Sequence, residues 1–510
     1  MKTFLYSVNL HPYDTLVMLL KKTNTLFDHF GLEDESLDRL ASPAAYKGLA
    51  AFHKYWGKKP IELTSFLIER LTNTNDIVLD PFLGGGLSAR CARELNRRFV
   101  GIDVNRISLE LADFFVNLPE LNVFQKAVKE VELKTRNLID ASYQTTDGLV
   151  ASHYLWDNNV LHEVWITEKR QKISRKATHF DLIKFSEYHD YSPRCLRNIK
   201  LFNNSRINSA SQMGWADLFT KRALRNIELL LESFEQYPLP VRRALKLTLT
   251  SNMGQMSNMV FAISHRGKNR GIERSTNHEV GSWAIGYWRP RLHFEINVWN
   301  CFQIRANKLM KILEQFDLQK CTIEKSVKPF FCNSGCIGLF YDSCLNVLPQ
   351  MPDNSVTLII TDPPHGDRIP YLELSEIWNA VLSHNPSDFG SEIVISNAKE
   401  RTKSPQVFQE DMASFMRECT RILDAKKGFL AIMFNSADAE TWAFLQDTKL
   451  NFVGCFPQEY SANSIAQDNR SGSMKEDYVL VYAKNKLCNI NCLSQIKGWS
   501  SQFPKSSQYK

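Results

Sequence analysis

Residues 356–360, Val-Thr-Leu-Ile-Ile, lead directly into Asp362-Pro363-Pro364-His365. A run of this kind is typical of a strand buried inside a parallel sheet. Two consecutive prolines cannot continue strand pairing, so the chain must leave the sheet at the carboxyl edge of this strand, where open α/β sheets bind ligands. The segment therefore predicts an α/β sheet with a carboxylate held on a rigid turn at its ligand-binding edge. For Asp-Pro-Pro taken alone, an ordinary turn at a strand end is the alternative.

A second strand-and-turn segment ends in Asp80, 282 residues upstream (362 − 80). Residues 76–80 are rich in β-branched side chains, a glycine run follows at 84–86, and residues 89–95 have helical spacing. Glycines let a backbone approach a ligand closely, and a helix N-terminus offers unpaired N–H groups. The next short strand ends in Asp103, about where dinucleotide folds place the acid that binds a ribose hydroxyl. The glycine pattern is not G-x-G-x-x-G, which argues against a nicotinamide or flavin cofactor.

Three motifs carry a family resemblance: Asp80-Pro-Phe-Leu-Gly-Gly-Gly, Gly-Ile-Asp103-Val-Asn105 and Asp362-Pro-Pro-His365. Together they resemble the cofactor and catalytic signatures of the S-adenosylmethionine-dependent DNA amino-methyltransferases, which methylate adenine N6 or cytosine N4. The resemblance implies an α/β fold with a seven-stranded Rossmann-like methyltransferase sheet, and S-adenosylmethionine as the cofactor. The middle third of the chain matches only loosely. The chain departs from the family at His365, where a tyrosine, phenylalanine or tryptophan is usual.

The resemblance also implies which residues bind the cofactor. Asp103 would accept hydrogen bonds from the ribose hydroxyls, Lys58 could pair with the methionine carboxylate, and an acid after a later strand would lie near the adenine. The implied set is Trp56, Lys58, Asp80, Phe82, Gly84, Gly85, Gly86, Asp103, Asn105 and Asp342. The alternatives are a surface loop for residues 51–60 and helix caps for the three acids.

The proposed chemistry accounts for the catalytic residue types. An exocyclic amine is a poor nucleophile because its lone pair is delocalised into the ring. The carboxylate of Asp362 and the carbonyl of Pro363 would accept its two N–H protons, and Pro364 would help to fix both acceptors in place. The base must be flipped out of the duplex, and His365 would hold it as a flat platform or by a hydrogen bond. The leading Asp, rather than Ser, favours adenine N6 over cytosine N4.

Length and composition set limits on the class of protein. A chain of 510 residues predicts two or three domains, and 44% hydrophobic with 23% charged residues is typical of a soluble globular protein. No apolar run approaches 18 residues and the N-terminus does not resemble a secretory signal, so we expect no membrane contact and a cytoplasmic location. The odd number of cysteines, 11, fits reduced thiols. A split zinc site at Cys332, Cys336, Cys488 and Cys492 has loose spacing, and we predict no metal.

The pattern of predicted elements divides the chain into four parts. Residues 1–50 form an N-terminal helical segment, and residues 51–110 with 326–485 form the methyltransferase domain. Residues 111–325 show no clear alternation of strand and helix, and such a long run cannot be a loop inside a compact domain. We interpret them as an inserted target-recognition domain, followed after the sheet by a polar tail at 486–510.

The charge of the insert points to a polyanionic partner. Residues 169–246 hold 16 Lys or Arg and 7 Asp or Glu, a formal excess of 9 in a chain whose total is only +7. A basic window in a nearly neutral chain predicts contact with double-stranded DNA, and a solvated basic face is the alternative. The residues predicted to contact nucleic acid are Arg194, Arg197, Arg222, Arg225, Arg266, Lys268, Arg270 and Arg289.

The sequence therefore predicts a site-specific DNA methyltransferase of a restriction-modification or phage-defence system, with a restriction nuclease or other defence protein as a possible partner. Two alternatives stay open because of the unusual His365. One is a catalytically impaired methyltransferase-like subunit that binds DNA or confers specificity. The other is an RNA base methyltransferase, which uses the same acid-and-proline logic.

Overall fold

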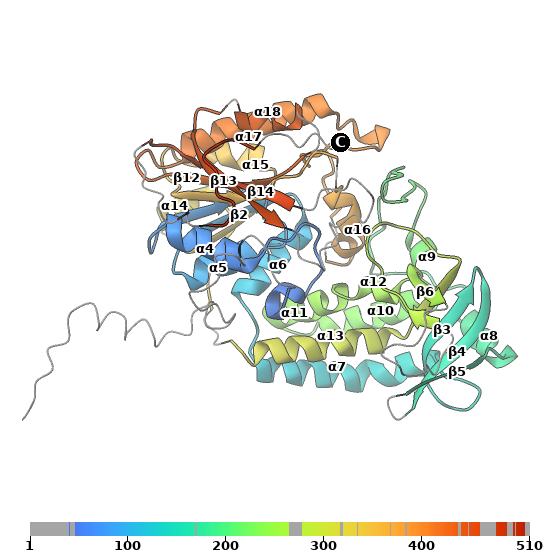
Figure 1. Ribbon diagram of the computed structural model, residues 1–510. Helices are drawn as coiled ribbons and strands as arrows, with labels where there is room; N and C mark the ends of the chain where they lie inside the picture. The colour runs from blue at the N-terminus through green and yellow to red at the C-terminus, as the bar shows by residue number, and fades with distance from the viewer. Residues whose placement is uncertain are drawn as a thin grey trace, which may run out of the picture.

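The computed structural model describes most of the chain (Figure 1). The described residues are 40, 46–168, 171–264, 278–316, 320–333, 335–367, 369–382, 385–436, 440–446, 448–459, 476–486, 493–494 and 496–504. The expected N-terminal helical segment lies mostly outside these residues, and the expected polar tail lies partly outside them. Among the described helices, none combines the length and apolar character needed to cross a bilayer.

The larger of two sheets has eight strands in the order β13-β14-β12-β11-β1-β2-β10-β9. Neighbouring strands from β12 to β9 are parallel, whereas β14 is antiparallel to both β12 and β13. The α/β class is as predicted, but the predicted count of seven strands is one short, because the two-residue β9 leaves no pattern in the sequence. The strands are β1 (Ile77–Asp80), β2 (Arg98–Asp103), β9 (Ile323–Glu324), β10 (Ile337–Tyr341), β11 (Leu358–Thr361), β12 (Phe429–Phe434), β13 (Asn451–Glu459) and β14 (Glu476–Ala483).

Helices cover both faces of this sheet, because side chains alternate between the two faces along each strand. Val78 of β1 belongs to one apolar cluster, while Ile77 and Leu79 belong to another. The first cluster includes α4 (Ile61–Leu71), α5 (Leu87–Glu94) and α6 (Arg106–Val116). The second includes α14 (Val327–Cys332), α15 (Cys344–Val347), α17 (Pro405–Ile422) and α18 (Ala443–Gln446) (Figure 1). Short 3-10 turns are η1 (Gly48–Ala51), η2 (Leu348–Gln350), η3 (Lys399–Arg401) and η4 (Glu440–Trp442).

The strand order reverses between β1 and β11, since β2 continues the sheet on one side and β12 on the other. Leu79 is paired with Ile359 across this junction. One strand position further on, the hydroxyl of Thr361 donates to Oδ1 of Asp80 over 3.2 Å. A reversal of this kind leaves a crevice at the carboxyl ends of the strands, where ligands bind. Both acid-ended strands found in the sequence therefore open into the same crevice.

A second, antiparallel sheet is built from the middle of the chain, in the order β5-β4-β3-β8-β6-β7. Its strands are β3 (Ala151–Asp157), β4 (Val160–Glu168), β5 (Gln171–Lys176), β6 (Val260–Ser264), β7 (His278–Val280) and β8 (Leu292–Ile296). Beside it lie α7 (Leu121–Ser142), α8 (His179–Ser186), α9 (Trp215–Leu218), α10 (Lys221–Phe234), α11 (Leu239–Thr250), α12 (Met253–Met256) and α13 (Val298–Leu313) (Figure 1). α16 (Tyr371–Leu382) lies between the two sheets, and its apolar residues join both parts in one core cluster.

A buried ion pair stabilises the second part and corrects one prediction. Arg222 of α10 and Glu295 of β8 are both fully buried, with Nε to Oε1 at 2.9 Å and Nη2 to Oε2 at 2.8 Å. The guanidinium group also lies over the rings of Tyr143 and Tyr154, 4.7 and 4.3 Å from their centroids. Arg222 therefore cannot contact DNA, and its predicted role was wrong because its charge is neutralised inside the protein.

This pair makes a testable prediction about stability. Replacing Arg222 by methionine leaves the Glu295 carboxylate buried without its partner, and we expect the free energy of unfolding to fall by about 3–5 kcal/mol. The matched control is Arg225→Met on the same helix. Arg225 is half-buried and donates to the carbonyl of Leu138, so we expect a loss below about 1 kcal/mol. Urea denaturation followed by tryptophan fluorescence measures both; equal losses would contradict the assigned role.

Candidate cofactor and catalytic site

A cavity opens at the strand reversal, with about 990 Å³ of empty volume including open solvent. It brings together segments that are far apart in the sequence. The lining comes from residues 55–59, Thr64, the glycine loop at 80–88, residues 103–105 at the end of β2, residues 342–344, residues 360–362, Pro364, residues 371–372, residues 391–393 and Met433. Asp362 and the glycine loop therefore face one cavity, as the two sequence motifs required.

The glycine loop has a left-handed backbone geometry that favours glycine. Gly84 and Gly86 have φ of +51° and +75°, values that L side chains rarely adopt. A Cβ at Gly86 would lie 2.8 Å from the backbone nitrogen of Ala112, so helix α6 packs directly against the loop. The loop is therefore held close to the cavity floor by its own conformation and by α6.

Asp80 and Asp103 hold this loop and the strand ends in place. Oδ2 of Asp103 accepts from the amide of Gly84 over 2.8 Å, and Oδ1 accepts from the amide of Asn105 over 2.8 Å. Oδ2 of Asp80 accepts from the hydroxyl of Ser88 over 2.6 Å. Burial raises the pKa of Asp80 to about 7 and that of Asp103 to about 6. Both carboxyl groups line the cavity.

Two other predicted cofactor residues, Asn105 and Trp56, line the cavity and contact α16. The side-chain amide of Asn105 donates to Ser375 over 2.9 Å and accepts from Asn379 over 2.9 Å, which ties β2 to α16. Trp56 is buried and stacks on Trp378, with ring centroids 4.8 Å apart.

The aliphatic part of the Lys58 side chain packs over Gly85, and its ammonium group donates hydrogen bonds to the carbonyls of Ala50 and His53. Burial lowers the pKa of Lys58 to about 7. Its side chain thus reaches from the cavity wall into the N-terminal segment. We refer to residues 46–59 as the strap.

Phe82 and Asp342 complete the predicted cofactor set in this cavity. The ring of Phe82 packs edge-on against Phe415 at 5.1 Å. Oδ1 of Asp342 accepts from the amide of Ser343 over 2.7 Å. The residue that caps α15 is Ser343, whose hydroxyl accepts from the amide of Leu345, so the alternative of Asp342 as the helix cap was wrong.

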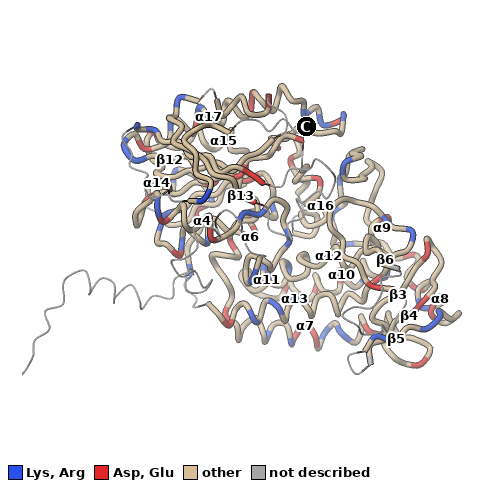
Figure 2. Tube along the Cα trace, in the orientation of Figure 1, with Lys and Arg blue, Asp and Glu red and all other residues tan. Residues whose placement is uncertain are grey.

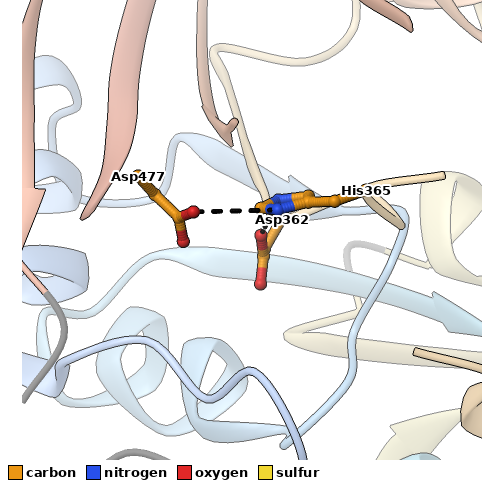
Figure 3. Close-up of side chains that lie close together, drawn as sticks. All are labelled: Asp362, His365 and Asp477. Carbon is orange, nitrogen blue, oxygen red and sulfur yellow. Dashed lines mark hydrogen bonds and ion pairs between the residues drawn. The ribbon is translucent and has the colours of Figure 1, made fainter. Parts of the chain in front are cut away.

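Asp362 is held by two side chains at the cavity edge, Lys59 and His365, and Figure 3 shows His365 between Asp362 and Asp477. Oδ1 of Asp362 lies 3.1 Å from Nζ of Lys59 and 3.0 Å from Nε2 of His365. Nζ of Lys59 also lies 2.5 Å from Oδ2 of Asp477, and Nδ1 of His365 lies 3.7 Å from Oδ1 of Asp477. Lys59 and His365 thus each bridge the two acids, which fixes the Asp362 carboxylate.

His365 packs against the sheet in this arrangement. Its side chain is 9% exposed, its ring meets that of Phe434 edge-on at 4.9 Å, and Nε2 also lies 3.3 Å from the carbonyl of Met433. A stacking platform needs an open ring face. The observed position favours a hydrogen-bonding role toward Asp362 over the stacking role predicted for this residue.

The ligand atoms of Asp362, His365 and Asp477 lie within 4.8 Å of one another, a grouping that could hold a metal ion. The ammonium group of Lys59 already lies between the two carboxylates, so the chain itself supplies the cationic charge there. Of the four cysteines in the alternative zinc site, Cys488 and Cys492 lie outside the described residues.

Two residues of this cluster were missed in the sequence. Lys59 follows Lys58 directly, and nothing in Lys-Lys-Pro shows which ammonium group turns toward Asp362. Asp477 begins β14, which is antiparallel to β12, so its amino end lies at the carboxyl edge of the parallel strands. That topological signal could have found Asp477, because an acid at the start of an antiparallel strand shares this edge.

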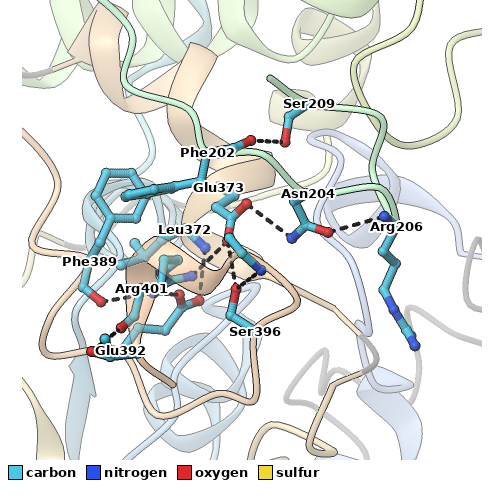
Figure 4. A network of polar contacts seen from close by, with 12 residues as sticks. Phe202, Asn204, Arg206, Ser209, Leu372, Glu373, Phe389, Glu392, Ser396 and Arg401 are labelled. Atoms are coloured by element: carbon cyan, nitrogen blue, oxygen red, sulfur yellow. Dashed lines mark hydrogen bonds and ion pairs between the residues drawn. The ribbon is translucent and has the colours of Figure 1, made fainter. Parts of the chain in front are cut away.

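A buried network fixes the cavity wall on the side of α16 (Figure 4). Arg401 donates to Oε1 of Glu373 over 2.9 Å and to Oε2 of Glu392 over 2.7 Å. Glu392 lines the cavity and accepts from the amide of Leu372 over 2.9 Å. Asn204, from the middle part of the chain, donates to Glu373 over 3.1 Å. The network thus links the cavity wall to the segment that precedes α9.

The residues predicted to contact nucleic acid differ in their exposure to solvent. Arg194 and Arg289 are exposed and Arg225 is half-buried. Arg197 is 9% exposed and forms a two-point ion pair with the buried Glu376, at 2.7 and 3.2 Å, so its predicted DNA contact was wrong for the same reason as that of Arg222. Arg266, Lys268 and Arg270 lie outside the described residues.

Ion pairs also reduce the net positive charge of residues 169–246 in the folded protein. Arg243 pairs with Glu110 and Asp113, and Arg175 pairs with Asp147 as well as with Asp181. Figure 2 accordingly shows acidic and basic residues interspersed along the helices of this part. Acids outside the window neutralise a share of its charge, so the exposed basic residues are fewer than the count predicted.

Burial of Asp80 makes a prediction about pH and stability. In the unfolded chain this carboxyl group ionises near pH 3.9, but in the folded protein near pH 7. The folded state therefore binds the extra proton between these values, and the contribution of this group to stability falls as the pH rises from 4 to 7. Asparagine does not titrate, so the Asp80→Asn variant lacks this loss. We expect the free energy of unfolding of the variant, relative to that of the wild type, to be about 1–3 kcal/mol higher at pH 8 than at pH 5.

Chemical denaturation of the protein without ligands, at pH 5 and at pH 8, measures this change in the free energy of unfolding. The control is Glu69→Gln, at an exposed position of α4, for which we expect no pH-dependent difference. A gain that shrinks with rising pH would contradict the assigned burial effect.

Comparisons with known proteins match part of the chain. Residues 18–113 match the N6_N4_Mtase family model, described as DNA methylase. Over 64 residues the chain is 41% identical to Type II methyltransferase M1.MboII of Moraxella bovis, covering 12% of this chain and 25% of that protein. Over 69 residues it is 41% identical to Type II methyltransferase M.HindIII of Haemophilus influenzae, covering 12% and 22%.

Type II methyltransferase M.HpaI of Haemophilus parainfluenzae is 28% identical over 124 residues, covering 24% of this chain and 38% of that protein. The matched part of the chain spans about a quarter of the length of the first two relatives. Among solved structures, the rRNA methyltransferase aviRa of Streptomyces viridochromogenes aligns over 89% of this chain and 94% of that chain, with 11% identity and a TM-score of 0.22, from which we infer nothing about the fold. The family match over residues 18–113, which include the strap and the glycine loop, supports a relationship to the DNA methyltransferases.

Proposed function

We propose that this protein is an S-adenosylmethionine-dependent DNA methyltransferase that modifies the exocyclic amine of a flipped base, adenine N6 in preference to cytosine N4. The observation that carries the proposal is a single cavity lined both by the glycine loop bound to Asp103 and by Asp362. The family match over residues 18–113 supports it independently.

The chain's residues fit the cofactor. Both oxygens of Asp103 are already fixed by backbone amides and lie on the cavity wall, so the carboxylate is oriented to accept the ribose hydroxyls. Gly84 to Gly86 would let the backbone lie against the sugar and methionine, and Asp342 would accept a hydrogen bond from the adenine amine. The bound cofactor supplies an electrophilic methyl group on a sulfonium.

Asp362 is the acceptor that activates the target amine. Lys59 and His365 bind Oδ1, while Oδ2 lies 3.7 Å from the position that a Cβ would take at Gly57. With Oδ1 fixed, Oδ2 can accept one N–H of the amine and the carbonyl of Pro363 the other, which draws the nitrogen lone pair out of the ring. The positive charge of Lys59 stabilises the carboxylate, and Asp362 is the group placed to take the proton that the methylated amine loses.

His365 and Asp477 are positioning residues in this mechanism, because they act through Asp362 and Lys59. An aromatic contact for the base then has to come from elsewhere. Tyr371 lines the cavity, and its hydroxyl oxygen lies 3.2 Å from the same Cβ position at Gly57 that Asp362 approaches. One face of its ring stacks on Tyr55, with centroids 6.1 Å apart, and we propose that the opposite face of Tyr371 contacts the flipped base.

The second sheet and its helices are proposed to bind double-stranded DNA. Arg194 and Arg289 are exposed there, and Trp288, 39% exposed, stacks on Phe261. Arg206 pairs with Asp367 in the catalytic loop at 2.6 Å, so this part of the chain reaches the loop that carries Asp362. Relatives named Type II methyltransferases and a probable Type III restriction-modification Mod subunit support a role in restriction-modification.

The first test uses Asp362→Ala with radiolabelled S-adenosylmethionine, mixed duplex DNA and digestion to nucleosides. We expect the rate of methyl transfer to fall at least about 10³-fold, because the proposed side-chain acceptor for the amine is removed. We expect the cofactor dissociation constant to change by less than about threefold. Asp367→Ala, on the same loop, is the control. Equal loss of transfer and cofactor binding would contradict the role of Asp362. Methylation of structured RNA in preference to DNA would favour the RNA alternative.

The second test separates two roles for His365. His365→Phe keeps a ring and loses the hydrogen bond to Asp362, whereas His365→Gln keeps a donor and loses the ring. We expect kcat to fall about 10–100-fold for the phenylalanine variant, the value of one hydrogen bond to a charged group, and less for glutamine. Single-turnover rates and cofactor binding measure the difference. Higher activity with phenylalanine than with glutamine would identify His365 as the base platform instead.

A further inference from the structure

A second cavity lies on the other side of the strap from the cofactor cavity, with about 1270 Å³ of empty volume including open solvent. Tyr55, Gly57 and Lys58 line both cavities. The opposite wall comes from the middle part of the chain, with the end of α11, residues of α12 and Arg305 of α13. This cavity therefore lies between the strap and the helices of the proposed DNA-binding part.

The charged side chains that line this cavity are cationic. Lys54, Lys58 and Arg305 line it, and none of the described lining residues is acidic. Nζ of Lys54 is bound by the carbonyl of Trp283 at 3.0 Å and by that of Ala284. Carbonyl oxygens bind an ammonium group but do not neutralise its charge. Three cationic groups thus share one cavity without a carboxylate on its described wall.

The remaining polar groups of the wall include donors for a ligand and one amide oxygen that needs a donor. Nε of Arg305 donates to Oδ1 of Asn252 over 3.3 Å, and the guanidinium group carries two further nitrogens. The amide nitrogen of Gln255 donates to Ser282 over 2.9 Å, whereas its Oε1 is buried without a hydrogen-bond partner. A hydroxyl or protonated oxygen of a ligand could satisfy that acceptor.

Burying like charges together is unfavourable. Desolvation, followed by repulsion from Arg305, lowers the pKa of Lys54 to about 7. Desolvation, followed by repulsion from Lys308 and Arg305, lowers the pKa of Lys58 to about 7. A bound anion would relieve this repulsion and favour the charged form of both lysines. The cavity is therefore in a strained electrostatic state that an anion would stabilise.

We propose that this cavity binds a phosphate group, in addition to the proposed methyl transfer. Three cationic side chains line this cavity, and they match the negative charge of a phosphate group, whether it is the single charge of a DNA phosphodiester or the higher charge of a terminal phosphate on a nucleotide. The phosphate can come from the DNA backbone, in which case the assignment rests on the proposed function, or from a free nucleotide. Because the strap lines both cavities, a bound phosphate would also hold the wall of the cofactor cavity.

The test measures sulfate binding, since sulfate keeps its charge between pH 6 and pH 8.5. At pH 6.5 and constant ionic strength, we expect sulfate, but not chloride, to raise the thermal midpoint of the full-length protein in a saturable way. Arg305→Met and Lys54→Met should each weaken sulfate binding at least tenfold. Lys311→Met, at an exposed position of α13, should leave it unchanged. No sulfate-specific stabilisation, or equal loss in the control, would overturn the proposal.

The dependence on pH gives a second readout. The charged and titratable groups that face the two lysines are Arg305 and Lys308 of α13, with His53 and Tyr46 of the strap. Both lysines lose their protons as the pH rises through about 7. We therefore expect sulfate binding to weaken about tenfold between pH 6 and pH 8.5, and tighter binding at high pH would contradict the site.

Duplex DNA affinity of the same variants identifies the source of the phosphate. A tenfold loss of DNA affinity in Arg305→Met, with no loss in Lys311→Met, assigns the site to the DNA backbone. Loss of sulfate binding with unchanged DNA affinity assigns it to a free phosphate ligand. Because sulfate binding is measured without DNA or cofactor, failure of this site is distinguishable from failure of the proposed methyl transfer.

Discussion

The parallel pairing of β1 with β11 is the constraint on which the rest of the molecule depends. It joins strands whose terminal acids are 282 residues apart (362 − 80), and it places the hydroxyl of Thr361 on the carboxylate of Asp80. Every component of the candidate site is arranged around this junction. Insertion of a long segment between paired strands costs little more than a short one, because loop-closure entropy grows only with the logarithm of length. The middle of the chain can therefore fold into its own sheet without disturbing the pairing.

Several glutamates in the interior of the protein are each neutralised by an arginine. Arg222 with Glu295, Arg197 with Glu376, and Arg401 with two glutamates each place a planar guanidinium against carboxylates from another part of the chain. Removing one member of such a pair leaves an uncompensated buried charge, which is why these contacts fix the relative position of the segments. The Asp362 cluster differs, because its cation is Lys59, a compact point charge without a rigid fork. Its acid is thus held in place while Oδ2 stays available to a ligand.

The sequence allowed the strands and the cavity to be predicted because those depend on local patterns. Apolar runs ending in Asp80, Asp103 and Asp362 define strand ends, and parallel strands bring their carboxyl ends to one edge. The pairing of charges could not be predicted in this way. The positive excess of residues 169–246 is reduced in space by Glu110, Asp113, Asp147, Glu295 and Glu376, all of which lie outside that window. Counting charged residues in a segment takes account only of residues that are close in sequence, whereas salt bridges form between residues that are close in space.

The strap shows how one short segment can serve two cavities of different chemistry. Lys58 and Lys59 are adjacent, so their side chains leave the backbone in different directions; one ammonium group binds carbonyls of the strap and the other binds the acids of the catalytic cluster. Gly57, with φ of +70°, lets the chain turn closely past Tyr371 and Asp362, where a Cβ would lie 3.2 Å from the tyrosine hydroxyl. A displacement of the strap would move both lysines at once, since they share one backbone. The geometry of Asp362 and the electrostatics of the second cavity are therefore coupled through these three residues.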